Sequence, residues 1–157
     1  MERLIKVSKD AGEKVDPQTL VELARQYAEL ARQYVQSGKA KEGAGLFEKL
    51  AESDAKNKSH YLKDAATAWL KAGEKDKARA TAKAAAQGPP DTRTKGLTHF
   101  WHRQLADVFL ETGEYQLAVE HFQKAIDSTD IDGYRKDCQK KLDLSTQKSS
   151  GGLESFL

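Results

Sequence analysis

The strongest constraint on the fold is a break between two apolar patterns in residues 100–125, at Thr112-Gly113-Glu114. Apolar residues recur at three- and four-residue spacing on each side of the break, which places them on one face of a helix. Because glycine ends helices readily, the stretch predicts two helices that fold back on each other. Small residues on these faces let the two backbones approach closely. The apolar residues are Leu105, Ala106, Phe109 and Leu110 before the break and Leu117, Ala118, Phe122 and Ala125 after it.

The same pattern occurs twice earlier, around Gly38 and Gly73, so that the three turn glycines are 35 and then 40 residues apart. The longer second interval contains extra residues around Pro89-Pro90-Asp91. A single helical hairpin cannot bury both of its faces, and about three are needed for a stable array. The equivalent apolar residues are Tyr27, Leu30, Ala31, Tyr34, Phe47 and Leu50 around Gly38, and Leu62, Ala65, Ala66, Trp69, Ala78, Ala82 and Ala85 around Gly73.

These hairpins resemble tetratricopeptide repeats (TPRs), whose first helix carries Trp-x2-Leu-Gly-x2-Tyr and whose second carries Ala-x3-Phe-x2-Ala. Two positions depart from the pattern, His102 in place of the tryptophan and Gly43 in place of a second-helix alanine. The resemblance implies an all-α fold, a right-handed α-α solenoid of three TPR-like helical hairpins with a C-terminal capping helix. The matching residues of the third hairpin are Leu105, Ala106, Phe109, Gly113, Tyr115, Ala118, Phe122 and Ala125.

The pattern divides the chain into an N-terminal arm at 1–16, a TPR-like domain at 17–148 and a flexible tail at 149–157. Repeats are expected at about 24–57, 59–92 and 99–132, with the capping helix at about 131–146. Asp16-Pro17 predicts the first helix start, because aspartate caps free amides and proline suits the first helical position. That helix should run to about Gln36.

Two stretches predict weak packing. Gly43 and Gly45 lower the helix propensity of their helix by up to about 1 kcal/mol each, so they either allow unusually close packing or leave the first hairpin locally soft. The second helix of the second hairpin has a run of alanines between Ala78 and Ala86. Alanines bury little apolar area, so we expect the core to be thinnest there.

The capping helix should begin at Ile131 and reach about Leu144. Repeat arrays need a terminal element with a polar outer face. The predicted inner residues are Ile131, Tyr134, Cys138 and Leu142, and the predicted outer residues are Arg135, Lys136, Asp137, Lys140 and Lys141.

The composition is that of a soluble, helix-rich protein, with 38% hydrophobic and 32% charged residues and three prolines among 157 residues. A net charge of +2 gives no general reason to expect nucleic-acid or membrane binding. The single cysteine rules out an intramolecular disulfide and favours a reducing compartment. No stretch approaches the roughly 20 apolar residues of a membrane span, and we expect a cytoplasmic protein.

The sequence offers little for catalysis, and we expect no enzyme activity, no catalytic residues, no cofactor and no metal. Phosphate-binding glycine motifs are absent. His99 and His102 are three residues apart and could share a helix face, but no third ligand stands at a diagnostic spacing, so both are interpreted as surface or packing residues. Cys138 is interpreted as a buried structural thiol.

The resemblance implies that the first helices of successive hairpins line a concave groove that binds a protein or peptide. Most of the residues carried over from the first two repeats are basic, so an acidic segment is the expected ligand. The predicted groove residues are Arg25, Ala28 and Arg32 from the first repeat, His60, Lys63, Thr67 and Lys71 from the second, and Phe100, Arg103, Asp107 and Glu111 from the third.

Two other functions stay open at this point. One is a homo-oligomeric scaffold that assembles through its ends. The other is an RNA-binding helical repeat, with Arg25, Arg32, Lys63 and Arg103 on phosphates and Phe100 and Trp101 stacking on bases. The final residues, Ser155-Phe156-Leu157, resemble a PDZ-domain ligand, and Leu153, Phe156 and Leu157 could instead dock into the groove of the same or a second molecule.

Overall fold

The computed structural model describes residues 16–89 and 97–154, with side chains up to residue 151. Most of the predicted N-terminal arm, Pro90 and the last three residues lie outside this range. The described residues form helices and no strands, so the prediction of an all-α fold is confirmed. The helices are α2 (Pro17–Gln36), α3 (Ala40–Ser53), the 3-10 helix η1 (Ala55–Asn57), α4 (Lys58–Lys71), α5 (Lys75–Ala86), α6 (Thr98–Glu111), α7 (Tyr115–Asp127) and α8 (Asp132–Glu154).

Helix α2 has the bounds that the sequence predicts. The Asp16 carboxylate accepts a hydrogen bond from the backbone N–H of Gln18 at 3.2 Å, and Pro17 occupies the first helical position. Aspartate satisfies an amide that the helix cannot, and proline has no amide to leave unpaired. The start of α2 therefore follows from two adjacent residues.

The same turn joins α2 to α3, α4 to α5 and α6 to α7. Gly38, Gly73 and Gly113 have φ of 87°, 80° and 84°, the left-handed region that favours glycine. In each turn the residue after the glycine donates its N–H to the carbonyl five residues earlier, for example Glu114 to Phe109 at 2.8 Å. The glycine itself donates to the carbonyl three residues earlier, as in Gly73 to Leu70 at 3.0 Å. Both bonds together make the Schellman motif, which fixes how each hairpin closes.

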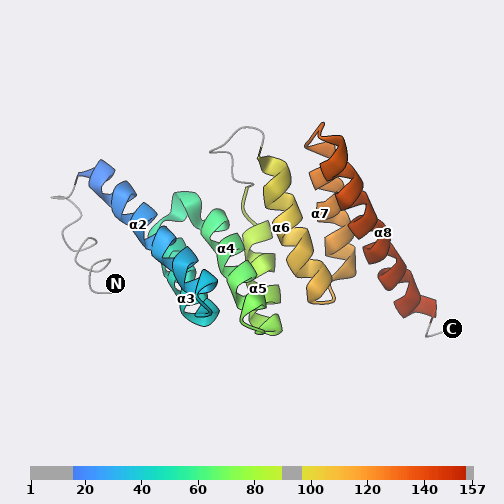
Figure 1. The fold of residues 1–157 in the computed structure, drawn as a ribbon, viewed down its shortest axis with the longest axis horizontal. Coiled ribbons are helices and arrows are strands. Elements are labelled where there is room, and N and C mark those ends of the chain that lie inside the picture. The colour runs from blue at the N-terminus through green and yellow to red at the C-terminus, as the bar shows by residue number, and fades with distance from the viewer. Residues whose placement is uncertain (1–15, 90–96, 155–157) are drawn as a thin grey trace.

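The helices follow one another in a row along the long axis of the molecule, with α2, α4, α6 and α8 nearer the viewer and α3, α5 and α7 behind them (Figure 1). Each helix packs against the next in the chain, and α6 also packs against α4 and α5. Helix α2 does not pack against α4 in the way that α4 packs against α6. The first hairpin is therefore joined to the rest mainly through α3 and α4, where the Trp69 indole N–H donates to Glu48 at 2.8 Å.

The core runs along this row. In the third hairpin Leu105, Phe109 and Phe122 are fully buried. In the second hairpin α5 contributes only small side chains to the core, including Ala78, Ala82 and Ala85, which matches the thin packing that the sequence predicts. Burial of so little apolar area contributes correspondingly little free energy.

The two glycines of α3 have different surroundings. A Cβ added at Gly43 would lie 2.6 Å from Val35 Cγ2 and 2.8 Å from the Ala31 carbonyl oxygen, both on α2. A Cβ added at Gly45 would meet nothing within 4 Å. Gly43 therefore allows α2 and α3 to pack closely, whereas Gly45 has no such role.

Helix α8 differs from the sequence prediction in three ways. It continues to Glu154, so residues 149–154 are helical and the helix extends past its predicted end at about residue 146. Ile131 precedes the helix and is 60% exposed, although we predicted it on the inner side. Asp137 and Lys141, predicted on the outer face, are part-buried and pair with α6. Cys138 is fully buried as predicted, and burial raises the pKa of its thiol.

Candidate binding surface

The predicted groove residues of α6 are held by α8. The Arg103 guanidinium donates to Asp137 at 2.7 Å and lies 4.9 Å from the centre of the Tyr134 ring. Lys141 donates to Asp107 at 2.9 Å, and Asp107 is also 3.9 Å from Arg103. Burial raises the pKa of the Tyr134 hydroxyl to about 12, so it stays neutral beside the guanidinium. These four charges form one network between the two helices.

The spacing of this network has a simple origin. Arg103 and Asp137 are 34 residues apart, as are Asp107 and Lys141. Both pairs have the same offset, and their members are four residues apart on each helix, so the two contacts lie one helical turn apart. That spacing is the signal in the sequence that could have identified Asp137 and Lys141 as partners of α6.

On α4 the predicted residues are partly engaged. Lys63 Nζ is 3.3 Å from Asp64, and His60 Nε2 is 3.4 Å from the same carboxylate. The Thr67 hydroxyl donates to the Lys63 carbonyl at 3.1 Å. Lys63 is 8% exposed, so this cation is less accessible than the sequence prediction assumed. Lys71, at the end of α4, is exposed.

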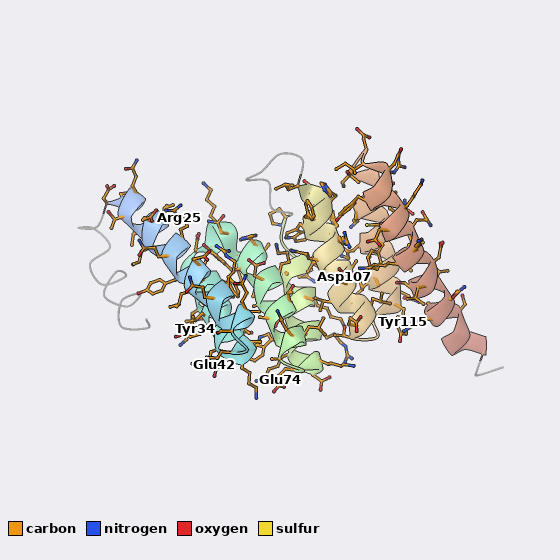
Figure 2. All side chains as sticks on the ribbon, in the orientation of Figure 1. Arg25, Tyr34, Glu42, Glu74, Asp107 and Tyr115 are labelled. Atoms are coloured by element: carbon orange, nitrogen blue, oxygen red, sulfur yellow. The ribbon has the colours of Figure 1, made fainter. Side chains whose placement is uncertain are left out.

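On α2 the predicted cations pair with carboxylates of their own helix. Arg25 is 2.8 Å from Glu22, and Arg32 is 3.3 Å from Glu29. The hydrogen bond from Arg25 lowers the pKa of the Glu22 carboxyl. Both pairs are largely exposed to solvent, and such pairs are weak and screened by salt. Figure 2 shows Arg25 on α2 and Asp107 on α6, further along the row of helices.

Two predicted contact residues are not available on the surface. Ala28 is only 5% exposed, so it is not accessible to a ligand as the sequence prediction assumed. Trp101, predicted to stack on RNA bases, is only 3% exposed and packs edge-on against His102, so it cannot contact a base. Phe100 and Glu111 are exposed, and the Phe100 ring also packs against Tyr134 at 5.4 Å.

The histidines of α6 do not share a partner. His99 faces α8, where its ring lies 4.6 Å from that of Tyr134, and His102 faces α7, where its Nδ1 lies 3.1 Å from Nδ1 of His121. Both are buried, as a packing role predicts. Within residues 16–89 and 97–154 no group of three or more His, Cys, Asp or Glu side chains could hold a metal ion. Nothing in the sequence pattern indicated the contact between His102 and His121.

An open hollow lies on the first hairpin, between Tyr34 of α2 and Glu42 and Leu46 of α3. It contains none of the predicted groove residues. Tyr34 and Glu42 lie near the turned end of that hairpin (Figure 2). None of the helices in the described part of the chain combines the length and apolar character that spanning a bilayer requires.

No model of a known protein family matches this chain, and no curated protein is similar to it at a significant level. The class of this protein is therefore defined by its fold, which is an all-α row of similar helical hairpins.

Proposed function

We propose that this chain is a non-catalytic protein–protein interaction module, an adaptor or scaffold that binds an acidic segment of another protein across the exposed sides of α2 and α4. The observation that carries the proposal is a difference in how the cations of this surface are engaged. Arg25 and Arg32 have only exposed partners on their own helix, and Lys71 has no hydrogen bond or ion pair within the described residues. Arg103, in contrast, is held by Asp137 and Tyr134 of α8.

This difference decides which cations can accept a ligand. An incoming carboxylate can replace Glu22 or Glu29 with little loss, because the exposed pairs contribute little to stability. Displacing Asp137 from Arg103 would break a part-buried hydrogen bond to a charged group, which is worth about 1.5–3 kcal/mol. Attraction from the three accessible cations would mainly speed encounter and fix the orientation of the ligand.

We further infer that the row is a right-handed solenoid of TPR-like repeats, in which α2, α4 and α6 line the concave side. Three Schellman turns of the same form, the burial of most motif residues of the second and third hairpins, and the 34-residue spacing between α6 and α8 support this. In the family the concave side holds extended or helical peptides. A cytoplasmic location is consistent with the single cysteine and the balanced charge.

The experiment compares protein capture by the intact chain with capture by the variant Arg25→Glu/Arg32→Glu/Lys71→Glu. Proteins retained from a native lysate are identified by mass spectrometry, and the affinity of the purified partner is then measured at low and at physiological salt. Loss of at least tenfold in affinity is expected for the variant, with the larger loss at low salt because salt screens the attraction.

The matched control is Arg135→Glu/Lys136→Glu/Lys140→Glu on the exposed side of α8, which changes the net charge by the same amount. It should retain the partner. Equal loss in both variants would show that net charge and not this surface governs binding. If neither the intact chain nor the variants retains a protein and light scattering shows concentration-dependent association, self-assembly replaces the proposal.

A further inference from the structure

A pair of histidines joins the two helices of the third hairpin. His102 of α6 and His121 of α7 approach through their Nδ1 atoms at 3.1 Å, with ring centres 5.4 Å apart. They are 7% and 4% exposed. Trp101 packs edge-on against His102, and Phe109 lies 5.5 Å from His121. The imidazole pair therefore sits in a mostly apolar environment between two helices.

A neutral imidazole has one N–H and one bare nitrogen, so the contact is a hydrogen bond only when one Nδ1 carries a proton and the other does not. One proton added to the pair can be accommodated at an Nε2. When both rings are protonated, both Nδ1 atoms carry hydrogen and two positive charges face each other in a buried place. The hydrogen bond is then replaced by repulsion, and burial makes the repulsion stronger than in water.

The other charges around α6 and α7 do not compensate for this. On α7, Lys124 adds to the positive potential at both rings and Glu120 opposes it, and these two side chains pair with each other at 3.0 Å.

The neighbouring helices direct their charges elsewhere. Asp137 and Lys141 of α8 are engaged by α6 side chains other than His102. Arg79 and Lys83 of α5 contact the turn after α6, and Lys63 and Asp64 of α4 pair with each other. The supporting ion pairs and hydrogen bonds are Arg103–Asp137, Asp107–Lys141, Arg79–Thr112, Lys83–Glu114 and Lys63–Asp64.

We propose that the imidazole pair is an acid-operated latch. It holds α6 against α7 as long as at least one ring is neutral, and it loosens the third hairpin when both rings are protonated. The proposal concerns the fold's response to acid and does not depend on the proposed binding function. Burial, then the charges of His121 and Lys124, lowers the pKa of His102 to about 4. Burial and Lys124 lower the pKa of His121 as well.

The direction of the pH dependence follows from these shifts. A histidine whose pKa is lowered in the folded state binds fewer protons there than in the unfolded state. The contribution of the neutral His102 to the stability of the fold is therefore fully present above the ordinary pKa of 6.5, and it is lost as the pH falls towards about 4. With a pKa of 6.5 in the unfolded state and about 4 in the folded state, protonation of His102 alone raises the unfolding equilibrium constant about 70-fold between pH 7.5 and pH 4.5. The shift at His121 acts in the same direction.

The test compares the wild type with His102→Asn/His121→Asn, in which amides can replace the hydrogen bond but cannot be protonated. A Trp69→Phe background leaves Trp101 as a local fluorescent probe beside the pair. In the wild type, Trp101 fluorescence should change at a higher pH than helicity, and the unfolding constant should rise about 70-fold or more. The double variant should lose most of this rise, while His60→Asn, a histidine outside the pair, should keep it. An unchanged rise in the double variant would overturn the proposal.

If the double variant does not fold, a measurement on the wild type tests the proposal instead. The imidazole C–H signals of His102 and His121 are followed by NMR from pH 8 to pH 4 in the folded wild type. The latch requires both signals to titrate below the usual pH, with line broadening of α6 and α7 amides at the onset. Two independent titrations near pH 6.5 without such broadening would contradict it.

Discussion

Replacing each glycine of α3 by alanine should have clearly different effects on stability, although the two positions are only two residues apart. Alanine has a higher helix propensity than glycine by about 0.8–1.0 kcal/mol, and this gain is common to both substitutions. At Gly45 the new methyl group meets nothing within 4 Å, so Gly45→Ala should stabilise the protein by about 0.5–1 kcal/mol. Gly45→Ala therefore serves as the control for Gly43→Ala, because both variants change a glycine of the same helix to alanine.

At Gly43 the gain is opposed by a steric clash. The methyl group would lie 2.6 Å from Val35 Cγ2 and 2.8 Å from the Ala31 carbonyl oxygen. The valine side chain can rotate, but the carbonyl belongs to the backbone of α2 and can move only with the helix. Forced overpacking of this kind costs about 1–3 kcal/mol. Because the propensity gain cancels in the comparison, Gly43→Ala should be less stable than Gly45→Ala by about 1–3 kcal/mol.

The assay is urea unfolding at pH 7.5 followed by far-UV circular dichroism, with both variants and the wild type measured together. Equal slopes are needed for the midpoints to report stability alone. A Gly43→Ala protein as stable as Gly45→Ala would show that α2 and α3 are not closely packed at this point. Adding Val35→Ala to Gly43→Ala should recover part of the loss, and strict additivity of the two changes would count against a contact between them.

Other substitutions test the remaining elements of the fold. Phe122→Ala removes a fully buried ring from the third hairpin and should cost about 3–5 kcal/mol in urea unfolding; a cost below about 1 kcal/mol would contradict its burial. Gly73→Ala, at a φ of 80° with open space around it, should cost about 1–2 kcal/mol from backbone strain alone, and no loss of thermal stability would mean that the turn has another conformation. Asp16→Ala removes the N-cap of α2 and should lower the free energy of unfolding by about 1 kcal/mol, with some loss of helicity. Asp16→Asn should leave both unchanged, because asparagine caps equally well. Arg79→Met should cost about 1.5–3 kcal/mol because the guanidinium bonds to the Thr112 carbonyl, and a double-mutant cycle with Glu114→Gln should show coupling.

Much of the helix pattern could be predicted because it depends on local chemistry. Asp16 and Pro17 determine where α2 begins, and the glycines at 38, 73 and 113 occupy left-handed turns that other residues adopt at a cost. The burial of Cys138 followed from its place on an apolar helix face. These features involve residues within one or two helical turns of each other.

The engagement of surface residues could not be predicted in the same way. Whether Arg103 is free depends on α8, 34 residues further along the chain, and the sequence pattern assigned its partner Asp137 to the opposite face. Ile131 was misplaced because the helix begins one residue later, at Asp132. The contact between His102 and His121 depends on the rotation of two helices about their own axes, which apolar periodicity does not determine to the accuracy of a hydrogen bond.

The limited packing of α2 has a consequence for how the molecule opens. Helix α2 rests mainly on α3, whereas α6 contacts α4, α5 and α7. In a structure whose units contact only their neighbours, free energy is distributed unevenly along the row, and an end unit can detach without the loss of the others. Backbone amides of α2 should therefore exchange with deuterium through local fraying, while those of α6 and α7 exchange only when larger parts of the chain unfold. The part of the proposed binding surface that lies on α2 would then be less protected than the part on α4, and a bound partner would slow exchange most on α2.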